Sequence, residues 1–442
     1  MVEKLGIEHV PDNMRHGRTG QLFTLWLASN LTIADYALGF LPVSLGVPLP
    51  SIILALFVGN ILGSLFLALS VAMGPKMGYP QMFISRWSFG TKGNYLFSAL
   101  NWVSTAGWFT VNVILGSFAL QVLVPSIPFY VAALVTTAVE VLLAIYGYDV
   151  IHSFEKVMSI ILGALFTFAT ILIFTQHTSE IMAYAPAPSS SPLALFAITL
   201  AASFSYVMSW SPYGSDYSRY LPESTRYRKS IVNSFVGAFI GSFWLEVIGA
   251  LIGILAPSAS DATRALPTAL GPFGLLVVLA IVLGGVAANV LNIYTNALSA
   301  LVLDIKANRW KVVVVGGIVG FFLALYGGGN FAGFYETFLL LLDYWITPWL
   351  GIIVVDFFVL KRLSYKTLGA LPRVSWQAIL SYAIGILVSI LFIPSISYVN
   401  YTGPASQLLG GADFSYFVSF IVAAALYYLL MRGRKLEGPR PQ

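Results

Sequence analysis

Long apolar runs separated by short polar segments dominate the chain. Each run is long enough to cross a hydrocarbon layer of roughly 30 Å as a helix. Barrel strands would need only about ten residues of alternating polarity, so these continuous runs favour helices. The pattern predicts an all-α polytopic membrane protein with about twelve transmembrane helices, near residues 22–43, 51–73, 94–121, 127–146, 156–175, 193–214, 231–256, 272–302, 311–327, 332–358, 376–394 and 413–431.

Composition supports this interpretation. Of the 442 residues, 58% are hydrophobic and 9% are charged, whereas soluble domains carry about 25% charged residues. The first 20 residues are polar and contain no apolar core, so we expect no cleavable signal peptide. Cysteine is absent, which excludes disulfides and thiolate chemistry.

The basic residues predict an orientation. If the N-terminus is cytoplasmic, 22 of the 23 Lys and Arg residues fall in cytoplasmic segments, and Arg264 alone falls outside. This positive-inside pattern predicts cytoplasmic N- and C-termini. The net charge of +5 therefore reflects topology and gives no reason to expect a nucleic-acid partner. The short loops and tails favour the inner membrane of a prokaryotic cell.

A proline- and serine-rich linker at 186–192 follows the fifth predicted span. Because five is odd, a second group of five spans begins on the opposite side of the membrane, which is the inverted repeat of many secondary transporters. We expect a cytoplasmic N-terminal segment 1–21, a first five-helix repeat 22–175, a second, inverted repeat 193–358, two trailing helices within 376–431 and a cytoplasmic tail 432–442.

Two spans contain candidate helix breaks. In the sixth span, Ser209–Gly214 includes Pro212, which removes a backbone donor. In the first span the corresponding stretch is Ser29–Thr32, where no Gly or Pro lies inside 21–38. Transporters of this kind bind their solutes at such breaks. The alternative is that both stretches only kink their helices.

Polar residues recur on one face of two other spans. Trp108 and Asn112 share a face in the third span with Asn101 and Thr105, and the eighth span carries Asn289, Asn292 and Asn296. An aromatic ring with an amide one turn away suits a planar heterocycle. The amides of the eighth span also fit sodium coordination, and either stripe could instead hold helices together.

Acidic residues fall inside predicted spans that contain no basic partner, and the candidates among them are Asp35, Glu140, Glu246, Glu336 and Asp343. A carboxylate at that depth binds a cation or carries a proton, unless it lies nearer the interface than predicted. Asp35, one turn after the first break, is the candidate proton carrier. The four histidines lie in or near predicted loops without metal-ligand spacing, so we expect neither an enzyme nor a cofactor, and no metal beyond a sodium ion.

Four separated motifs resemble the nucleobase–cation symporter family, in its purine–cytosine permease branch. They are the loop 74–93 with Arg86–Gly93, then Gly107–Phe109, Ser209–Pro222 and Ala288–Tyr294, and they appear in the family's order. Relatives in that family transport hydantoins and allantoin. The resemblance implies a five-plus-five inverted repeat with two trailing helices and alternating access.

The resemblance also implies roles for individual residues. Trp108 would stack on the base, and Trp210 or Phe204 would close its other face. Asn112 and Asn292, with Asn30 in the first break, would bind the ring, and Ser29, Thr32 and Asn289 match the positions of a sodium site. Two departures favour a proton instead of sodium: Leu291 replaces a common proline, and Asn292–Ile293 lacks the expected hydroxyl pair.

The leading hypothesis is therefore a symporter for cytosine or a purine, coupled to a proton or a sodium ion. A second is a symporter for another planar ring, such as allantoin, a hydantoin or thiamine. A third is a transport-inactive receptor with the same fold, and an intramembrane enzyme is the weakest, because no nucleophile–base pair is present.

Overall fold

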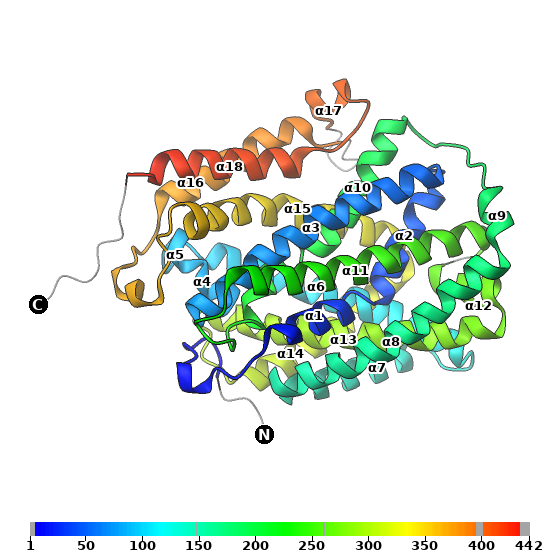
Figure 1. Ribbon diagram of the computed structural model, residues 1–442, viewed down its shortest axis with the longest axis horizontal. Coiled ribbons are helices and arrows are strands. Elements are labelled where there is room, and N and C mark those ends of the chain that lie inside the picture. The colour runs from blue at the N-terminus through cyan, green and yellow to red at the C-terminus, as the bar shows by residue number, and fades with distance from the viewer. Residues whose placement is uncertain (1–4, 147, 260, 395–400, 434–442) are drawn as a thin grey trace, which may run out of the picture.

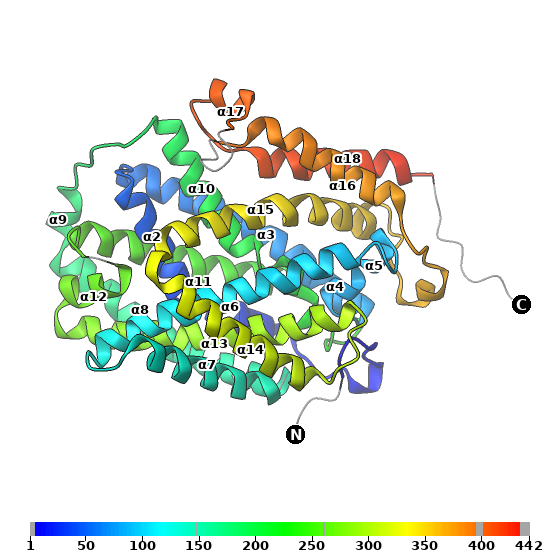
Figure 2. The ribbon, with the colours of Figure 1, turned by 180° about the vertical axis from the view of Figure 1, so that it is seen from behind.

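The computed structural model describes residues 5–146, 148–259, 261–394 and 401–433, and within these ranges it contains helices but no β-strand (Figure 1). The long helices run along the longest axis of the molecule (Figures 1 and 2). In this part of the chain, nine helices are long and apolar enough to cross a membrane, and three shorter apolar helices accompany them. Each of the twelve predicted spans overlaps one of these helices, and the first span also includes a further helix.

The first five spans comprise six helices, because the first span is broken, and two short helices follow the second span. Their bounds are α1 Thr19–Ala28, α2 Ile33–Ser44, α3 Leu49–Met77, α4 Gln81–Ile84, α5 Arg86–Phe89, α6 Tyr95–Leu123, α7 Phe129–Tyr146 and α8 Tyr148–Gln176. A short helix, α9 Thr178–Met182, leads into the proline-rich linker.

The next five spans repeat this order of elements, with a break in the first of them and a short helix after the second. Their bounds are α10 Pro192–Met208, the 3₁₀ segment η2 Ser211–Asp216, α11 Tyr227–Leu255, α12 Ala262–Leu270, α13 Pro272–Val302, α14 Arg309–Gly327 and α15 Phe331–Val354. The trailing helices α16 Trp376–Ser389 and α18 Ser415–Met431 pack on α15, and α17 Pro404–Leu408 lies between them in the chain (Figure 1).

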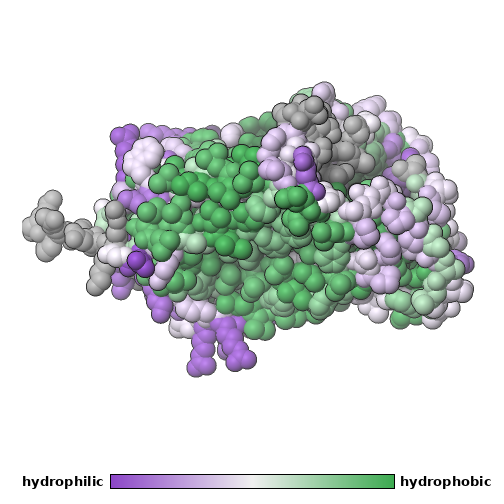
Figure 3. All heavy atoms as spheres, turned by 90° about the horizontal axis from the view of Figure 1, so that it is seen from above, coloured by the Kyte–Doolittle hydropathy of each residue, from purple (hydrophilic) through white to green (hydrophobic). Residues whose placement is uncertain are grey.

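The surface agrees with a membrane setting. Apolar side chains cover the middle of the face drawn in Figure 3, and more polar side chains gather towards both of its ends. Exposed apolar residues such as Val103, Ile160 and Phe322 are 67%, 67% and 63% accessible. A soluble protein rarely exposes so large an apolar area, whereas lipid covers it without penalty.

Both predicted breaks are confirmed. In the first span, α1 ends at Ala28 and α2 begins at Ile33, and Thr32 caps α2 by accepting a bond from the Asp35 N–H at 3.3 Å. In the sixth span, α10 ends at Met208 and gives way to η2, with Pro212 in its first turn. The first break thus depends on a threonine cap and not on Gly or Pro.

Glycines let the first span approach two other helices closely. A Cβ on Gly39 of α2 would lie 1.9 Å from the Glu246 carbonyl oxygen of α11. A Cβ on Gly284 of α13 would lie 1.9 Å from the Leu31 carbonyl oxygen, within the break. Because a side chain at either position would clash with backbone, these glycines set how closely α11 and α13 surround the broken helix.

The N-terminal segment and the loop 74–93, which carries the first family-like motif, lie together at one end of the molecule. Arg15 donates to the Pro75 carbonyl at 2.7 Å, and the buried Arg219 donates to the Gly6 carbonyl at 2.6 Å. The side chain of Arg86 donates to the Val302 carbonyl at the end of α13. The Trp87 indole donates to the Ser364 carbonyl and the Ser88 hydroxyl to the Asp356 carboxylate, both in the segment after α15. The loop 74–93 therefore joins the end of α13 to the segment after α15.

Two details differ from the sequence prediction. Helix α8 begins at Tyr148, not near 156, so His152 is a buried helical residue and does not lie in a loop. The connection before α13 contains α12, which Asp261 caps by accepting the Thr263 N–H at 2.9 Å. A search for apolar runs misses these helix starts because polar residues occupy the first turns.

Replacing Gly39 by alanine should destabilise the fold, because its Cβ would meet the Glu246 carbonyl. Overpacking of this kind typically costs about 1–3 kcal/mol. We expect a lower melting temperature and less monodisperse protein in detergent. Gly163→Ala in α8 is the matched control, since nothing lies within 4 Å of its added Cβ. Equal stability of the two variants would contradict the close crossing.

The N-terminal segment should also contain a titrating contact. His16 Nε2 lies 2.9 Å from Asp149 Oδ1, and this bond, followed by the one to the Met14 carbonyl, raises the pKa of His16 above 6.5. The contact is therefore strongest below the ordinary pKa of histidine and weakens as the pH rises through the raised value. In NMR titrations of labelled histidines, Asp149→Asn should lower the pKa of His16. His9, whose pKa is lowered by burial, is the internal control.

Candidate substrate and cation site

Helices α6 and α13 run side by side and bring the two predicted polar stripes together. The Asn112 and Asn292 amides both donate to Asn289 Oδ1, at 3.1 and 3.0 Å. Asn112 also donates to the carbonyl of Trp108, one turn earlier, at 3.1 Å. The structure thus places Trp108, Asn112, Asn289 and Asn292 in one connected group.

Asn289 is the centre of this group. Its amide donates to the Phe109 carbonyl at 3.0 Å and to Glu140 Oε2 of α7 at 2.9 Å. With these bonds it links α13 to both α6 and α7. The side chain of Asn289 is therefore held in a fixed orientation, and it fixes the orientation of Asn112 and Asn292 in turn.

Three polar atoms of this group have no hydrogen-bond partner among the described residues. They are the Trp108 indole N–H and the amide oxygens of Asn112 and Asn292, whose side chains are at most 4% exposed. A buried polar group without a partner costs about 1–3 kcal/mol. One donor and two acceptors are consequently available to a ligand that offers an acceptor and two N–H groups.

Aromatic side chains surround Trp108. The rings of Tyr206 and Phe338 lie edge-on to it with centroids at 5.3 and 5.2 Å, and Tyr335 lies at 6.2 Å. The sequence analysis did not single out these three residues, which come from α10 and α15. Together with the indole they form an aromatic cluster, here called the ring enclosure, of the kind on which a planar ring can stack.

Phe204 lies elsewhere. It stacks on Tyr416 of α18 at 5.2 Å and contacts Phe66 of α3 at 5.5 Å. Phe204 and Tyr206 are two residues apart, so they point to opposite sides of α10. In this structure Tyr206, and not Phe204, is the residue of α10 that contacts Trp108.

Asn30 and Trp210 lie together where the two breaks meet. The Trp210 indole donates to Asn30 Oδ1 at 3.1 Å, and the Asn30 amide donates to the Trp26 carbonyl at 2.6 Å. Trp26 and Trp210 make an edge-on ring contact at 5.8 Å. This pair of predicted binding residues therefore joins the first span to the sixth.

The three residues expected at a sodium site are not joined by hydrogen bonds. Ser29 and Thr32 lie in the first break, where Thr32 Oγ1 bonds the Tyr206 hydroxyl at 2.7 Å and buried Ser29 Oγ has no described partner. The amide of Asn289 bonds α6 and α7, as described above. Helix α13 reaches the break at Gly284. In the described ranges, no group of three or more His, Cys, Asp or Glu side chains is arranged to hold a metal ion.

Other polar residues of the two stripes hold the helices together. The Asn296 amide donates to the Trp102 carbonyl at 2.8 Å and to Thr105 Oγ1 at 2.9 Å. Asn101 donates to Ser299 Oγ at 2.8 Å. These bonds brace α6 against α13, as the structural alternative predicts. The oxygens of Asn112 and Asn292 have no described partner, and a binding role for them stays a prediction.

Four of the five acidic candidates in the spans are buried inside the protein. Asp35, Glu140, Glu246 and Asp343 are all fully buried, and the side chain of Glu336 lies outside the described residues. Asp35 occupies the first turn of α2, where Ser242 Oγ of α11 donates to its Oδ1 at 3.0 Å. Asp343 is likewise enclosed by protein, and its depth in the membrane stays a prediction.

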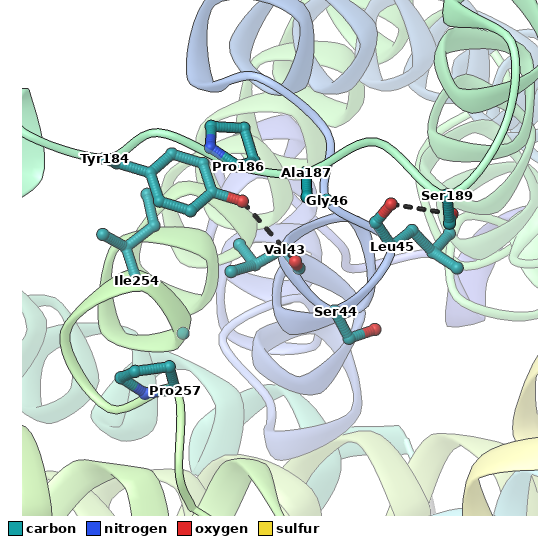
Figure 4. A pocket seen from close by; sticks show the side chains of 11 residues that line it. Val43, Ser44, Leu45, Gly46, Tyr184, Pro186, Ala187, Ser189, Ile254 and Pro257 are labelled. Atoms are coloured by element: carbon teal, nitrogen blue, oxygen red, sulfur yellow. Dashed lines mark hydrogen bonds between the residues drawn. The ribbon is translucent and has the colours of Figure 1, made fainter.

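A cavity of about 350 Å³ lies away from this group, where the linker between α9 and α10 crosses the end of α2 (Figure 4). The Tyr184 hydroxyl bonds the Val43 carbonyl at 3.5 Å, and Ser189 Oγ bonds the Leu45 carbonyl at 2.8 Å. No candidate site residue lines this cavity. It results from the way the linker is held against α2 and α11.

Comparison with known proteins agrees with this arrangement. The model of the family described as "Permease for cytosine/purines, uracil, thiamine, allantoin" matches residues 9–419. YxlA of Bacillus subtilis, whose name describes a purine–cytosine permease, is 31% identical over 98% of this chain and 96% of its own length. The purine–cytosine permease fcyB of Emericella nidulans is 26% identical over 97% of this chain and 88% of its own length.

The fold is also shared with a solved structure. Mhp1, a nucleobase–cation–symport-1 family transporter in a closed conformation with bromovinylhydantoin bound, superposes with a TM-score of 0.80. The two chains are 19% identical, and the match covers 98% of this chain and 96% of Mhp1. The protein is a multi-pass membrane transporter and not an enzyme, and it belongs to the nucleobase–cation symporter family, the permeases for cytosine/purines, uracil, thiamine and allantoin.

Proposed function

We propose that the chain imports a nucleobase, cytosine or a purine, together with a cation by alternating access. The ring stacks on Trp108 inside the enclosure of Tyr206, Tyr335 and Phe338. Asn112 and Asn292 bind its edge. The purine–cytosine permeases among its relatives support this choice of solute.

The observation that carries the proposal is the set of unpaired polar atoms beside an aromatic platform. The Asn112 and Asn292 oxygens accept N–H groups, and the Trp108 indole N–H donates to a ring carbonyl or ring nitrogen. Cytosine and the amino- and oxopurines present such donors and acceptors on one edge. A solute that lacks them leaves the buried amides unpaired and is rejected.

The breaks supply the rest of the proposed machinery. Asn30 and Trp210 join the two broken spans, so a change in the tilt of either half-helix alters the enclosure. Ser29, Thr32 and Asn289 remain the proposed ligands if the cation is sodium, and Asp35 is the proposed carrier if it is a proton. We place both termini in the cytoplasm and the chain in the cell's inner membrane, with two inverted repeats at 22–175 and 193–358.

Another planar ring is the alternative solute. Mhp1 is described with a hydantoin derivative bound, and the family description includes thiamine and allantoin. Each presents ring N–H, amino or carbonyl groups that could satisfy the same atoms. A transport-inactive receptor of this fold would bind such a ring but would not accumulate it.

Replacing Trp108 by alanine should strongly weaken saturable uptake. Stacking of a base on an aromatic ring contributes about 1–3 kcal/mol, so we expect the apparent affinity to be weaker by roughly 5- to 150-fold. The measurement is uptake of radiolabelled cytosine, adenine, hypoxanthine, uracil, allantoin and thiamine into proteoliposomes. Trp376→Ala, at a side chain that is 71% exposed on α16, is the control and should behave as wild type. Unchanged uptake by Trp108→Ala would contradict the platform.

Replacing Asn112 by alanine should change selectivity. Loss of this buried acceptor should weaken the binding of a solute that donates to it by about 1–3 kcal/mol, or roughly 5- to 150-fold. The binding of a solute that does not donate to it should be unchanged. Competition of the unlabelled rings against the transported one measures this. Asn233→Ala, whose amide donates to the Lys229 carbonyl of its own helix, is the control. An equal loss for every ring would indicate a purely structural role for Asn112.

A further inference from the structure

Two carboxyl groups meet deep inside the protein, between the first and seventh spans. Asp35 belongs to α2 and Glu246 to α11, and both are fully buried. Ser242 Oγ lies 3.0 Å from Asp35 Oδ1 and 3.4 Å from Glu246 Oε1. A single hydroxyl group, that of Ser242, therefore lies within hydrogen-bond distance of both carboxyl groups. Because a carboxylate carries no donor of its own, the two groups can bond each other only when one of them holds a proton.

The surroundings favour a proton over a metal cation. Glu246 Oε2 accepts bonds from the Asn60 amide at 2.5 Å and from Ser203 Oγ at 2.8 Å. These neighbours direct hydrogens at the carboxylate, whereas a sodium or calcium ion would need oxygen lone pairs directed at it. Asp35 Oδ2 receives no hydrogen bond from any donor in the described residues. It is the atom left for an acidic hydrogen.

Among the described side chains, the other groups that face the pair carry no positive charge. Helix α3 presents Asn60, and α10 presents Ser203 and Tyr206. Helix α15 presents Tyr335, whose hydroxyl donates to the Ala34 carbonyl at 2.9 Å. Two adjacent carboxylates without a counter-ion in a low-dielectric interior repel each other strongly, and one shared proton removes most of that repulsion.

A short series of contacts joins this pair to the ring enclosure. The Asp35 N–H bonds Thr32 Oγ1, and Thr32 Oγ1 lies 2.7 Å from the Tyr206 hydroxyl. The Tyr206 ring in turn packs edge-on against Trp108. Helix α2 therefore carries one carboxyl group of the pair and also, through its cap, the contact to the platform.

We infer that Asp35 and Glu246 together bind the proton that is co-transported with the solute. This inference rests on the proposed function and deepens it by assigning the coupling ion. One proton binds the pair from one side of the membrane, forming an O–H bond, and leaves as a proton on the other side, breaking that bond. Loss of the proton leaves two like charges across the α2–α11 contact and favours its separation, which also withdraws Thr32 from Tyr206.

The first test uses a pH gradient across proteoliposomes that contain the full chain. With the outside acidic, no membrane potential and one proton per solute, a gradient of about one pH unit supports about tenfold accumulation. Glu246→Gln and Asp35→Asn should lose this accumulation but retain solute exchange across the membrane without a gradient. Glu180→Gln, whose carboxyl group is 62% exposed, should accumulate as wild type. Accumulation by Glu246→Gln under the pH gradient, or accumulation by wild type that requires sodium, would overturn the assignment.

The second test needs no solute, so it separates this inference from the proposed function. Infrared difference spectra of the purified protein, taken between acidic and alkaline pH, should show the C=O band of a protonated carboxylic acid that disappears in Glu246→Gln and in Asp35→Asn. A band unchanged in both variants would refute the shared proton even if nucleobase uptake is found. If the band behaves as expected and no nucleobase is taken up, the proton site stands and the proposed solute fails.

Discussion

The hydrocarbon layer offers no hydrogen bonds, so every polar group inside a spanning segment must find a partner within the protein. Two spans leave the helical conformation within their length, after Ala28 and after Met208, and free backbone groups at those points. The side chains that surround the breaks come from distant helices: Tyr206 bonds Thr32, Trp210 bonds Asn30, and Tyr335 bonds the Ala34 carbonyl. The aromatic residues near Trp108 are therefore positioned by the same bonds that stabilise the broken helix.

The same requirement distinguishes structural amides from candidate binding residues. Both the oxygen and the amide of Asn296 are hydrogen-bonded, to Trp102 and Thr105, so the contact between α6 and α13 is enough to explain this residue. Asn112 and Asn292 are engaged through their N–H groups only, and their oxygens are buried without a described partner. A helix contact alone would be more stable with those oxygens satisfied, so leaving them free has a cost that binding of a ring can offset.

Much of the fold could be predicted from sequence because hydrocarbon thickness fixes the length of an apolar run. The break at Pro212 could be predicted for a similar reason, since proline cannot continue the hydrogen-bond pattern. The neighbours of Trp108 could not. Helix α10 is buried almost all round, so its apolar pattern does not show that Tyr206 faces Trp108 and Phe204 faces α18. The pairing of Asp35 with Glu246 depends on the crossing of α2 and α11 at Gly39, which only the tertiary structure reveals.

Coupling requires that solute and cation each bind one conformer more tightly than the other. The structure offers a physical reason why α2 could carry that preference. Its cap at Thr32 contacts Tyr206 of the ring enclosure, and its first turn carries Asp35 against Ser242. A ring held against Trp108 favours the position of Tyr206, and a proton on the pair favours the contact with α11. In the proposed mechanism, each ligand alone stabilises one of these two contacts of α2. The arrangement in which both contacts are made is therefore most stable when both ligands are bound. The affinities for solute and proton are then reciprocally linked.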